Sequence, residues 1–256
     1  MRSASVNGDI LLGMTNQRST TFFCFSPPVM LATFALEIGF AAYVLWRYKL
    51  TPITRLIVAM LTFLAIFQGT EFLLCGGLTL QGGTWSRIGY TAITMLPPLG
   101  IHLAFLLAGK KPGMLVAASY ISCAAFIAYF GFATQAISGH TCYANYITFD
   151  TASASTLPYT LYYYGWLFIG TFLTYKWASD LNKHRRAALY ALMGGYLALL
   201  VPTTTITLLW NETLAGIPSI MCGFAIILAG LLTFKVAPES IKLRRNTQSL
   251  RLRLPF

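Results

Sequence analysis

The sequence predicts an all-α, polytopic membrane protein, built as a bundle of seven transmembrane helices. Three observations predict this fold class. The 256-residue chain is 56% hydrophobic and only 10% charged, whereas a soluble domain carries about 25% charged residues. It contains seven apolar stretches, each near the length of about 20 residues that crosses a bilayer. Its basic residues alternate from one side of these stretches to the other, as they do in membrane proteins.

The seven predicted helices follow one another through most of the chain. They cover residues 27–46, 55–75, 88–108, 114–134, 157–177, 186–210 and 217–236. The domain organisation follows from these ranges: an outer N-terminal tail over 1–24, a transmembrane domain over 25–236, and a basic cytoplasmic tail over 237–256.

The connections explain where each helix stops. The first helix ends at Arg47, and a short turn with Pro52 leads into the second. A glycine-rich connection over 76–83 follows the second helix, because glycine favours turns over helix. Clusters of basic residues end the third and fifth helices. The longest connection, 135–156, is expected to be a polar loop, and a short polar turn separates the last two helices.

The basic residues also predict the orientation. Of the 18 Lys and Arg, 15 lie in connections on one side, and three (Arg2, Arg18 and Arg87) lie on the other. Because cationic loops are retained in the cytoplasm, the N-terminus is expected outside and the C-terminus inside. Anionic lipid headgroups account for the net charge of +11. Membrane lipids are therefore expected partners, and nucleic acid is not.

Three ionisable residues fall within predicted helices: Glu37 in the first, Glu71 in the second and His102 in the third. Such a side chain is costly at bilayer depth unless it is paired or hydrated, so each is a candidate functional residue. With a rise of about 1.5 Å per residue, Glu37 and His102 lie at similar depths and would pair if their helices are neighbours. The alternative is that these groups only hold helices together.

Gln68 and two aromatic residues extend this candidate ligand-binding or proton-relay set. Gln68 precedes Glu71 by three residues, so both side chains point the same way from the helix. Tyr163 and Trp166 belong to an aromatic cluster near the outer end of the fifth helix. They would line a ligand site, or form the aromatic belt that is common at membrane interfaces.

The third predicted helix contributes Thr94, on the same face as His102. The alternative for Thr94 is a hydroxyl bonded to a carbonyl of its own helix. Pro97 and Pro98 lie between these two residues. Proline lacks an N–H group, so the pair is expected to free backbone carbonyls and to kink the helix beside this polar face.

Three of the five cysteines, Cys24, Cys75 and Cys142, lie near the outer side. A disulfide between Cys75 and Cys142, a disulfide between Cys24 and Cys142, and free thiols are all compatible with the spacing. His140 and Cys142 are too few ligands for a metal site, so no metal is expected. We also find no catalytic motif, and the sequence indicates no particular cofactor.

Three segments carry a resemblance to a known family. They are Trp46-Arg47-Tyr48 at the end of the first predicted helix, Trp85-Ser86-Arg87-Ile88-Gly89-Tyr90 at the start of the third, and Met95-Leu96-Pro97-Pro98-Leu99-Gly100-Ile101-His102 within it. With its seven-helix layout, the chain resembles the N-terminal sensor module of bacterial membrane histidine kinases. The resemblance implies a location in the bacterial inner membrane and a bundle that passes a signal to the cytoplasm. Because no kinase domain follows here, it also implies a separate signalling partner.

The function expected from these observations is that of a receptor-like or sensory protein. It would bind a small or lipophilic ligand within the bundle and signal through a cytoplasmic partner. One alternative is a proton-coupled transporter that uses Glu71, Glu37 and His102. A second is an intramembrane enzyme with a glutamate as general base, although no nucleophile completes such a site. A third is a subunit of a larger membrane complex.

Overall fold

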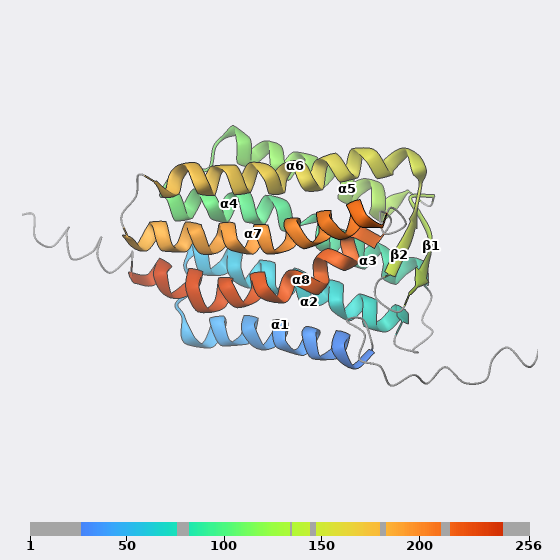
Figure 1. The fold of residues 1–256 in the computed structure, drawn as a ribbon, viewed down its shortest axis with the longest axis horizontal. Coiled ribbons are helices and arrows are strands. Elements are labelled where there is room, and N and C mark those ends of the chain that lie inside the picture. The colour runs from blue at the N-terminus through green and yellow to red at the C-terminus, as the bar shows by residue number, and fades with distance from the viewer. Residues whose placement is uncertain are drawn as a thin grey trace, which may run out of the picture.

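The computed structural model describes residues 27–75, 82–133, 135–143, 147–179, 183–210 and 216–242. The N-terminal tail expected over 1–24, and the basic tail beyond residue 242, lie outside the described residues. Within them, the protein is a bundle of long helices with a small β-hairpin at one end (Figure 1).

The helices run along the long axis of the bundle, and their bounds follow the apolar stretches of the sequence (Figure 1). They are α1 (Pro27–Arg47), α2 (Pro52–Cys75), α3 (Gly82–Thr94), α4 (Leu96–Ala108), α5 (Met114–Phe132), α6 (Ser153–Ala178), α7 (Lys183–Leu209), α8 (Ile217–Leu231) and the π-helical turn η2 (Leu232–Val236). The third helical rod begins earlier than expected, at Gly82. The last continues past the expected end at 236, as far as Lys242.

Six helical runs in the described residues are long and apolar enough to cross a membrane. They are α1, α2, α3 with α4, α5, α7, and α8 with its continuation. The protein is therefore a mostly helical, multi-pass membrane protein. Helix α6 has 26 residues and packs along α4 and α7, but its many tyrosines, threonines and serines lower its hydropathy. The total of seven spans stays a prediction.

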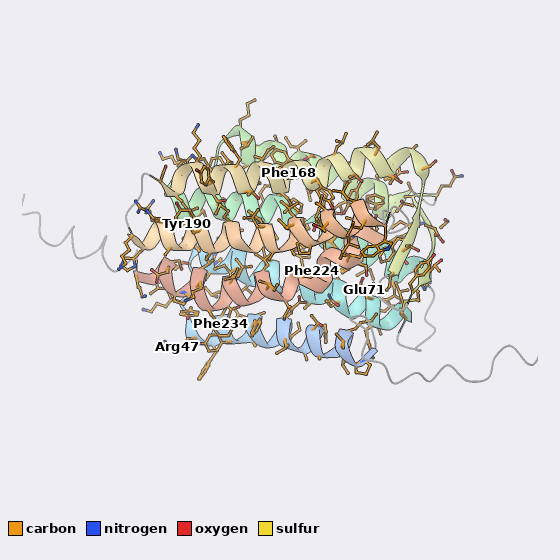
Figure 2. All side chains as sticks on the ribbon, viewed as in Figure 1. Arg47, Glu71, Phe168, Tyr190, Phe224 and Phe234 are labelled. Atoms are coloured by element: carbon orange, nitrogen blue, oxygen red, sulfur yellow. A yellow bond between two sulfur atoms is a disulfide. The ribbon has the colours of Figure 1, made fainter. Side chains whose placement is uncertain are left out.

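The two ends of the bundle differ in charge. Helix α1 begins at the end that carries the hairpin, and the last helical run finishes at the opposite end (Figure 1). Among the described Lys and Arg residues, Arg87 alone belongs to the hairpin end, and the others, such as Arg47 in Figure 2, belong to the opposite end or the helical turns next to it. The fold therefore gathers the basic residues at one end, and the orientation in the membrane stays a prediction.

The connection expected as a polar loop contains an antiparallel β-hairpin, so the fold is not purely α-helical. Its strands are β1 (Ile137–Cys142) and β2 (Ile147–Thr151). Ile147 and Phe149 alternate along β2 and are buried, which is how β-branched and aromatic residues stabilise a half-buried strand. The Ile147 N–H group also donates a hydrogen bond to Ser219 Oγ of α8, over 3.0 Å.

A disulfide joins Cys75, at the end of α2, to Cys142, at the end of β1. Of the two pairings that the sequence left open, the structure therefore contains this one, and Cys24 lies outside the described residues. The bond ties the hairpin covalently to the helical bundle.

The expected break at Pro97-Pro98 is present, because α3 ends at Thr94 and α4 starts at Leu96. Pro98 has no N–H group to donate to the carbonyl of Thr94, four residues earlier. Tyr162 of α6 compensates, because its hydroxyl donates to this carbonyl over 2.7 Å. The break is thus stabilised by a neighbouring helix.

Tyr196 of α7 fills the space where α4, α6 and α7 meet. Its side chain is buried, and it lies against Gly100 of α4 and Gly170 of α6. The two glycines leave room for the tyrosine ring, because a side chain at either position would collide with it.

Candidate functional site

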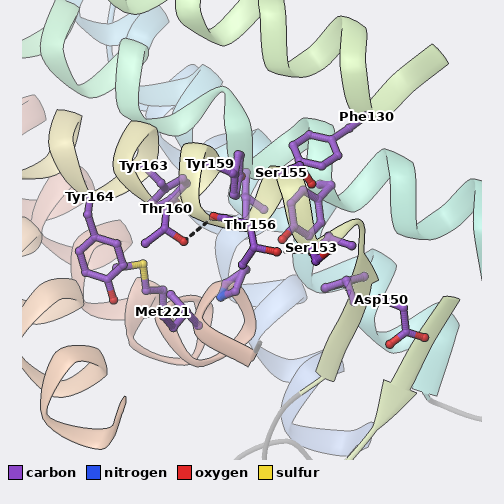
Figure 3. A pocket seen from close by; sticks show the side chains of 16 residues that line it. Phe130, Asp150, Ser153, Ser155, Thr156, Tyr159, Thr160, Tyr163, Tyr164 and Met221 are labelled. Atoms are coloured by element: carbon purple, nitrogen blue, oxygen red, sulfur yellow. Dashed lines mark hydrogen bonds between the residues drawn. The ribbon is translucent and has the colours of Figure 1, made fainter. Parts of the chain in front are cut away.

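A cavity of about 440 Å³ lies at the hairpin end of the bundle. Its walls come from the hairpin and from α3, α5, α6 and α8, so residues far apart in the sequence meet there (Figure 3). The lining residues are Tyr90, Ile93, Phe130, Phe149, Asp150, Thr151, Ser153, Ser155, Thr156, Tyr159, Thr160, Tyr163, Tyr164, Ile217, Pro218 and Met221.

One side of the cavity is aromatic. The rings of Tyr90 and Phe130 have centroids 4.7 Å apart, and Tyr159 lies 5.1 Å from each of them. Phe149 of the hairpin adds a ring 5.3 Å from Tyr90 in an edge-on arrangement. Such ring contacts fix the shape of the wall, so this side presents a preformed apolar surface.

The other side of the cavity carries the hydroxyl groups of the first turns of α6. Ser155 Oγ donates to the Ala152 carbonyl over 2.7 Å, and Thr160 Oγ1 donates to the Thr156 carbonyl over 2.8 Å (Figure 3). Because their protons are already used, these hydroxyls can offer a ligand only acceptor lone pairs.

The charge of the lining restricts the ligand further. Among the described residues, Asp150 is the one charged residue of the lining, and no described Lys, Arg or His contributes to it. Asp150 is exposed, so it belongs to the rim of the cavity. An anionic ligand would find no cation here, whereas a neutral or cationic molecule with hydrogen-bond donors would find acceptors.

Of the predicted site residues, only Tyr163 lines this cavity. Within the part of the chain that the structure describes, its hydroxyl makes no hydrogen bond, and the same holds for the hydroxyls of Tyr90 and Ser153 in the lining. Tyr163 is therefore one of three lining residues whose hydroxyl could donate a hydrogen bond to a bound molecule.

Glu37, Gln68 and Glu71 lie together in a second polar region, where α1, α2 and α8 pack. Figure 2 shows Glu71 within the bundle rather than at either end. Both glutamates are completely buried and close enough to interact electrostatically. Gln68 Nε2 donates to the Cys222 carbonyl of α8 over 3.1 Å.

The two carboxyl groups lack partners. None of their four oxygens has a hydrogen-bond partner among the described residues, and neither forms an ion pair there. The hydroxyl of Ser219 is a polar neighbour of the Glu71 carboxyl group, although the two do not meet the geometry of a hydrogen bond.

His102 does not pair with Glu37, so that expectation is wrong. Its Nδ1 atom lies 3.2 Å from the hydroxyl of Tyr120 on α5. The reason is the direction of the side chains, because α1 packs on α2 and α8, whereas this face of α4 meets α5. Similar depth in the membrane was not sufficient for contact.

Thr94 and Trp166 serve the packing between helices instead. Thr94 Oγ1 donates to the Tyr90 carbonyl over 2.6 Å and lies 3.0 Å from the Tyr159 hydroxyl. Trp166 Nε1 donates to Ser122 Oγ of α5 over 3.1 Å. The alternative reading of Thr94, a hydroxyl bonded to its own helix, describes the structure.

Sequence reasoning missed most of the cavity, including Tyr90, Phe130, Phe149 and Met221. The alternation of Ile147 and Phe149 was a usable signal, since it indicates a strand with one buried face. The run of hydroxyl residues before Pro158 was a second signal, because hydroxyls gathered at one end of a membrane helix indicate a polar site there.

The fold and the cavity together define a multi-pass helical membrane protein with a preformed cavity, aromatic on one side, beside a disulfide-linked hairpin. No protein-family model matches the chain, and neither does any curated protein. The resemblance to histidine-kinase sensor modules therefore stays a prediction.

Proposed function

We propose that the protein is a receptor-like membrane protein that binds a small lipophilic molecule, neutral or cationic, in the cavity at the hairpin end. The observation that carries this proposal is the cavity itself. Its volume of about 440 Å³ falls in the range of roughly 300–1,000 Å³ that is usual for small-molecule sites. Aromatic walls with a few polar groups are also typical of such sites.

The position of the cavity supports a signalling role. Helices α6 and α8 form part of its wall and extend to the basic end of the bundle (Figure 1). A ligand that favours one arrangement of these helices would shift the population of that arrangement. A cytoplasmic partner could then detect the change at the basic end.

The other expected functions have less support. The proton-coupled transporter relied on Glu71, Glu37 and His102 acting together, but His102 lies apart from the two glutamates, next to Tyr120. For the intramembrane enzyme, Ser219 and Cys222 do lie near Glu71, but both glutamates are completely buried, and no cavity that we describe reaches them. A role as a subunit of a larger complex remains an alternative, for which co-purification of a partner protein is the direct observation.

A cavity-filling variant tests the proposal. In Thr160→Trp the indole would occupy the cavity, whereas in Leu161→Trp the indole would point away from the bundle, because Leu161 is 66% exposed. We expect mass spectrometry of organic extracts to find a small molecule with the wild-type protein and with Leu161→Trp, but not with Thr160→Trp.

Tyr163→Phe provides a finer test, because it removes one hydrogen-bond donor and keeps the ring. Loss of one hydrogen bond of about 1 kcal/mol would lower the ligand affinity about fivefold. Extracts that contain only bulk lipid, or a bound molecule that persists in Thr160→Trp, would contradict the proposed site.

A further inference from the structure

The contact between α1, α2 and α8 contains two acidic side chains for which the described residues supply no neutralising charge. Glu37 and Glu71 are both 0% exposed, and their oxygens have no partner among the described residues. An ionised carboxylate is strongly disfavoured in such surroundings, and a second one nearby disfavours it further. The pair therefore needs a positively charged ligand.

The neighbours of the pair supply no such charge. Cys222 of α8 faces both carboxyl groups, and Ser219 of the same helix lies beside Glu71. From α2, the neighbour is Gln68, whose amide nitrogen is bonded to the Cys222 carbonyl. From α6, Tyr163 approaches Cys222. These groups are neutral thiol, hydroxyl and amide groups. On α1 itself the other titratable side chains, Tyr43 and Arg47, lie six and ten residues further along, toward the basic end.

The ligand that fits is a proton on each carboxyl group. A metal ion would need more ligands, and the described residues contain no group of three or more His, Cys, Asp or Glu that could hold one. A proton requires no additional ligands and no extra space. It also turns each carboxyl group into a hydrogen-bond donor, and for Glu71 the hydroxyl of Ser219 is a neighbouring acceptor.

We propose that Glu37 and Glu71 form a proton-binding site within the membrane, and that its occupancy controls the packing of α1 against α2 and α8. With protons bound, the interface is neutral and closes tightly. Loss of a proton leaves an unpaired negative charge in it. Helix α1 lies at the edge of the bundle and packs chiefly on α2 and α8, so it is the element that would move to admit water or a cation. This inference does not depend on the proposed ligand cavity.

Infrared spectroscopy tests proton occupancy directly in the wild-type protein. With isotope-labelled glutamate, we expect a carbonyl band of protonated glutamate at neutral pH that shifts with the label. Glu37→Gln and Glu71→Gln should each remove part of this band. Glu239→Gln is the control, because Glu239 lies at the basic end and is ionised there, with His184 at 2.6 Å and Lys242 at 2.9 Å.

The pH dependence of stability tests the effect on packing. Because the folded protein holds these protons more tightly than the unfolded chain, its stability is highest at low pH and falls as the pH rises through the titration of the pair. The double variant Glu37→Gln/Glu71→Gln cannot lose these protons, so its melting temperature should fall less over the same pH range.

Two results would overturn the proposal. One is a wild-type spectrum without a protonated-glutamate band at neutral pH, which needs no variant to interpret. The other is a melting temperature that depends on pH equally in the wild type and in the double variant.

Discussion

Replacing Gly170 by Ala tests how closely α6 packs on α7. A Cβ atom at this position would lie 2.9 Å from Tyr196 Cε2 and 3.4 Å from Ile101 Cδ1. The first distance is shorter than carbon atoms tolerate, and Tyr196 is buried, so its ring has little room to move. Overpacking of this kind costs about 1–3 kcal/mol, and the better helix propensity of Ala returns about 0.5–1 kcal/mol.

We therefore expect Gly170→Ala to lower the free energy of unfolding by up to about 2.5 kcal/mol relative to the wild type, and by about 1–3 kcal/mol relative to an Ala variant without the collision. Gly165→Ala is the matched control on the same helix, because a Cβ there would meet no atom within 4 Å. It should leave the stability unchanged or raise it slightly. Equilibrium unfolding in mixed micelles measures both. Equal stabilities of the two variants would refute the close contact with Tyr196.

Gly100 sharpens the same test from the opposite side of the tyrosine. A Cβ at Gly100 would collide first with the hydroxyl oxygen of Tyr196, whereas at Gly170 it would collide with a ring carbon. Tyr196→Phe removes only the hydroxyl. We therefore expect it to restore much of the stability lost in Gly100→Ala and little of that lost in Gly170→Ala. Equal rescue of both variants would mean that the ring is oriented differently.

Two further predictions concern the hairpin and the helix break. Replacing Cys75 and Cys142 together by Ser opens a loop whose ends are 67 residues apart. We expect this double variant to lose up to about 4 kcal/mol in unfolding free energy and to show faster proteolysis of the hairpin. Unchanged protease resistance would contradict this prediction. Tyr162→Phe removes the hydroxyl that donates to the Thr94 carbonyl, and it should lower the unfolding free energy by about 1 kcal/mol. The control is Tyr175→Phe, at an exposed position, measured by the same unfolding assay. Equal stability of the two variants would show that the helix break needs no support from α6.

The helices could be predicted from the sequence because lipid imposes a simple rule on them. Each span must satisfy its own backbone hydrogen bonds and be long enough to cross the bilayer, so apolar length and the flanking charges locate it. The break at Pro97-Pro98 was also predictable, since it follows from the missing N–H groups alone. The role of Tyr162, which donates to the freed carbonyl, was not predictable, because this residue comes from a distant part of the chain.

The hairpin was missed because its strands are short and polar. Ser138, Gly139, His140 and Thr141 read as a loop, and only the burial of Ile147 and Phe149 against the bundle makes β2 a strand. That burial is a tertiary effect, which a local pattern of a few residues indicates only weakly.

The candidate site shows a similar limit. The rise per residue gave the depths of Glu37 and His102, but contact also depends on how each helix is rotated and on which helices are neighbours. The structure places Glu37 near Glu71 and His102 beside Tyr120. The position of each residue along its helix could thus be read from one sequence, its depth in the membrane stays a prediction, and the direction of the side chain around the helix could not be predicted.

The disulfide between Cys75 and Cys142 has a topological consequence for the cavity. It closes the chain between these residues into a ring that contains α3, α4, α5 and β1. The walls from α3 and α5 belong to this ring, whereas those from α6 and α8 belong to the open remainder of the chain. The cavity therefore lies where the disulfide-closed ring meets the rest of the chain. The aromatic wall itself crosses this boundary, because Tyr90 and Phe130 belong to the ring whereas Phe149 and Tyr159 do not.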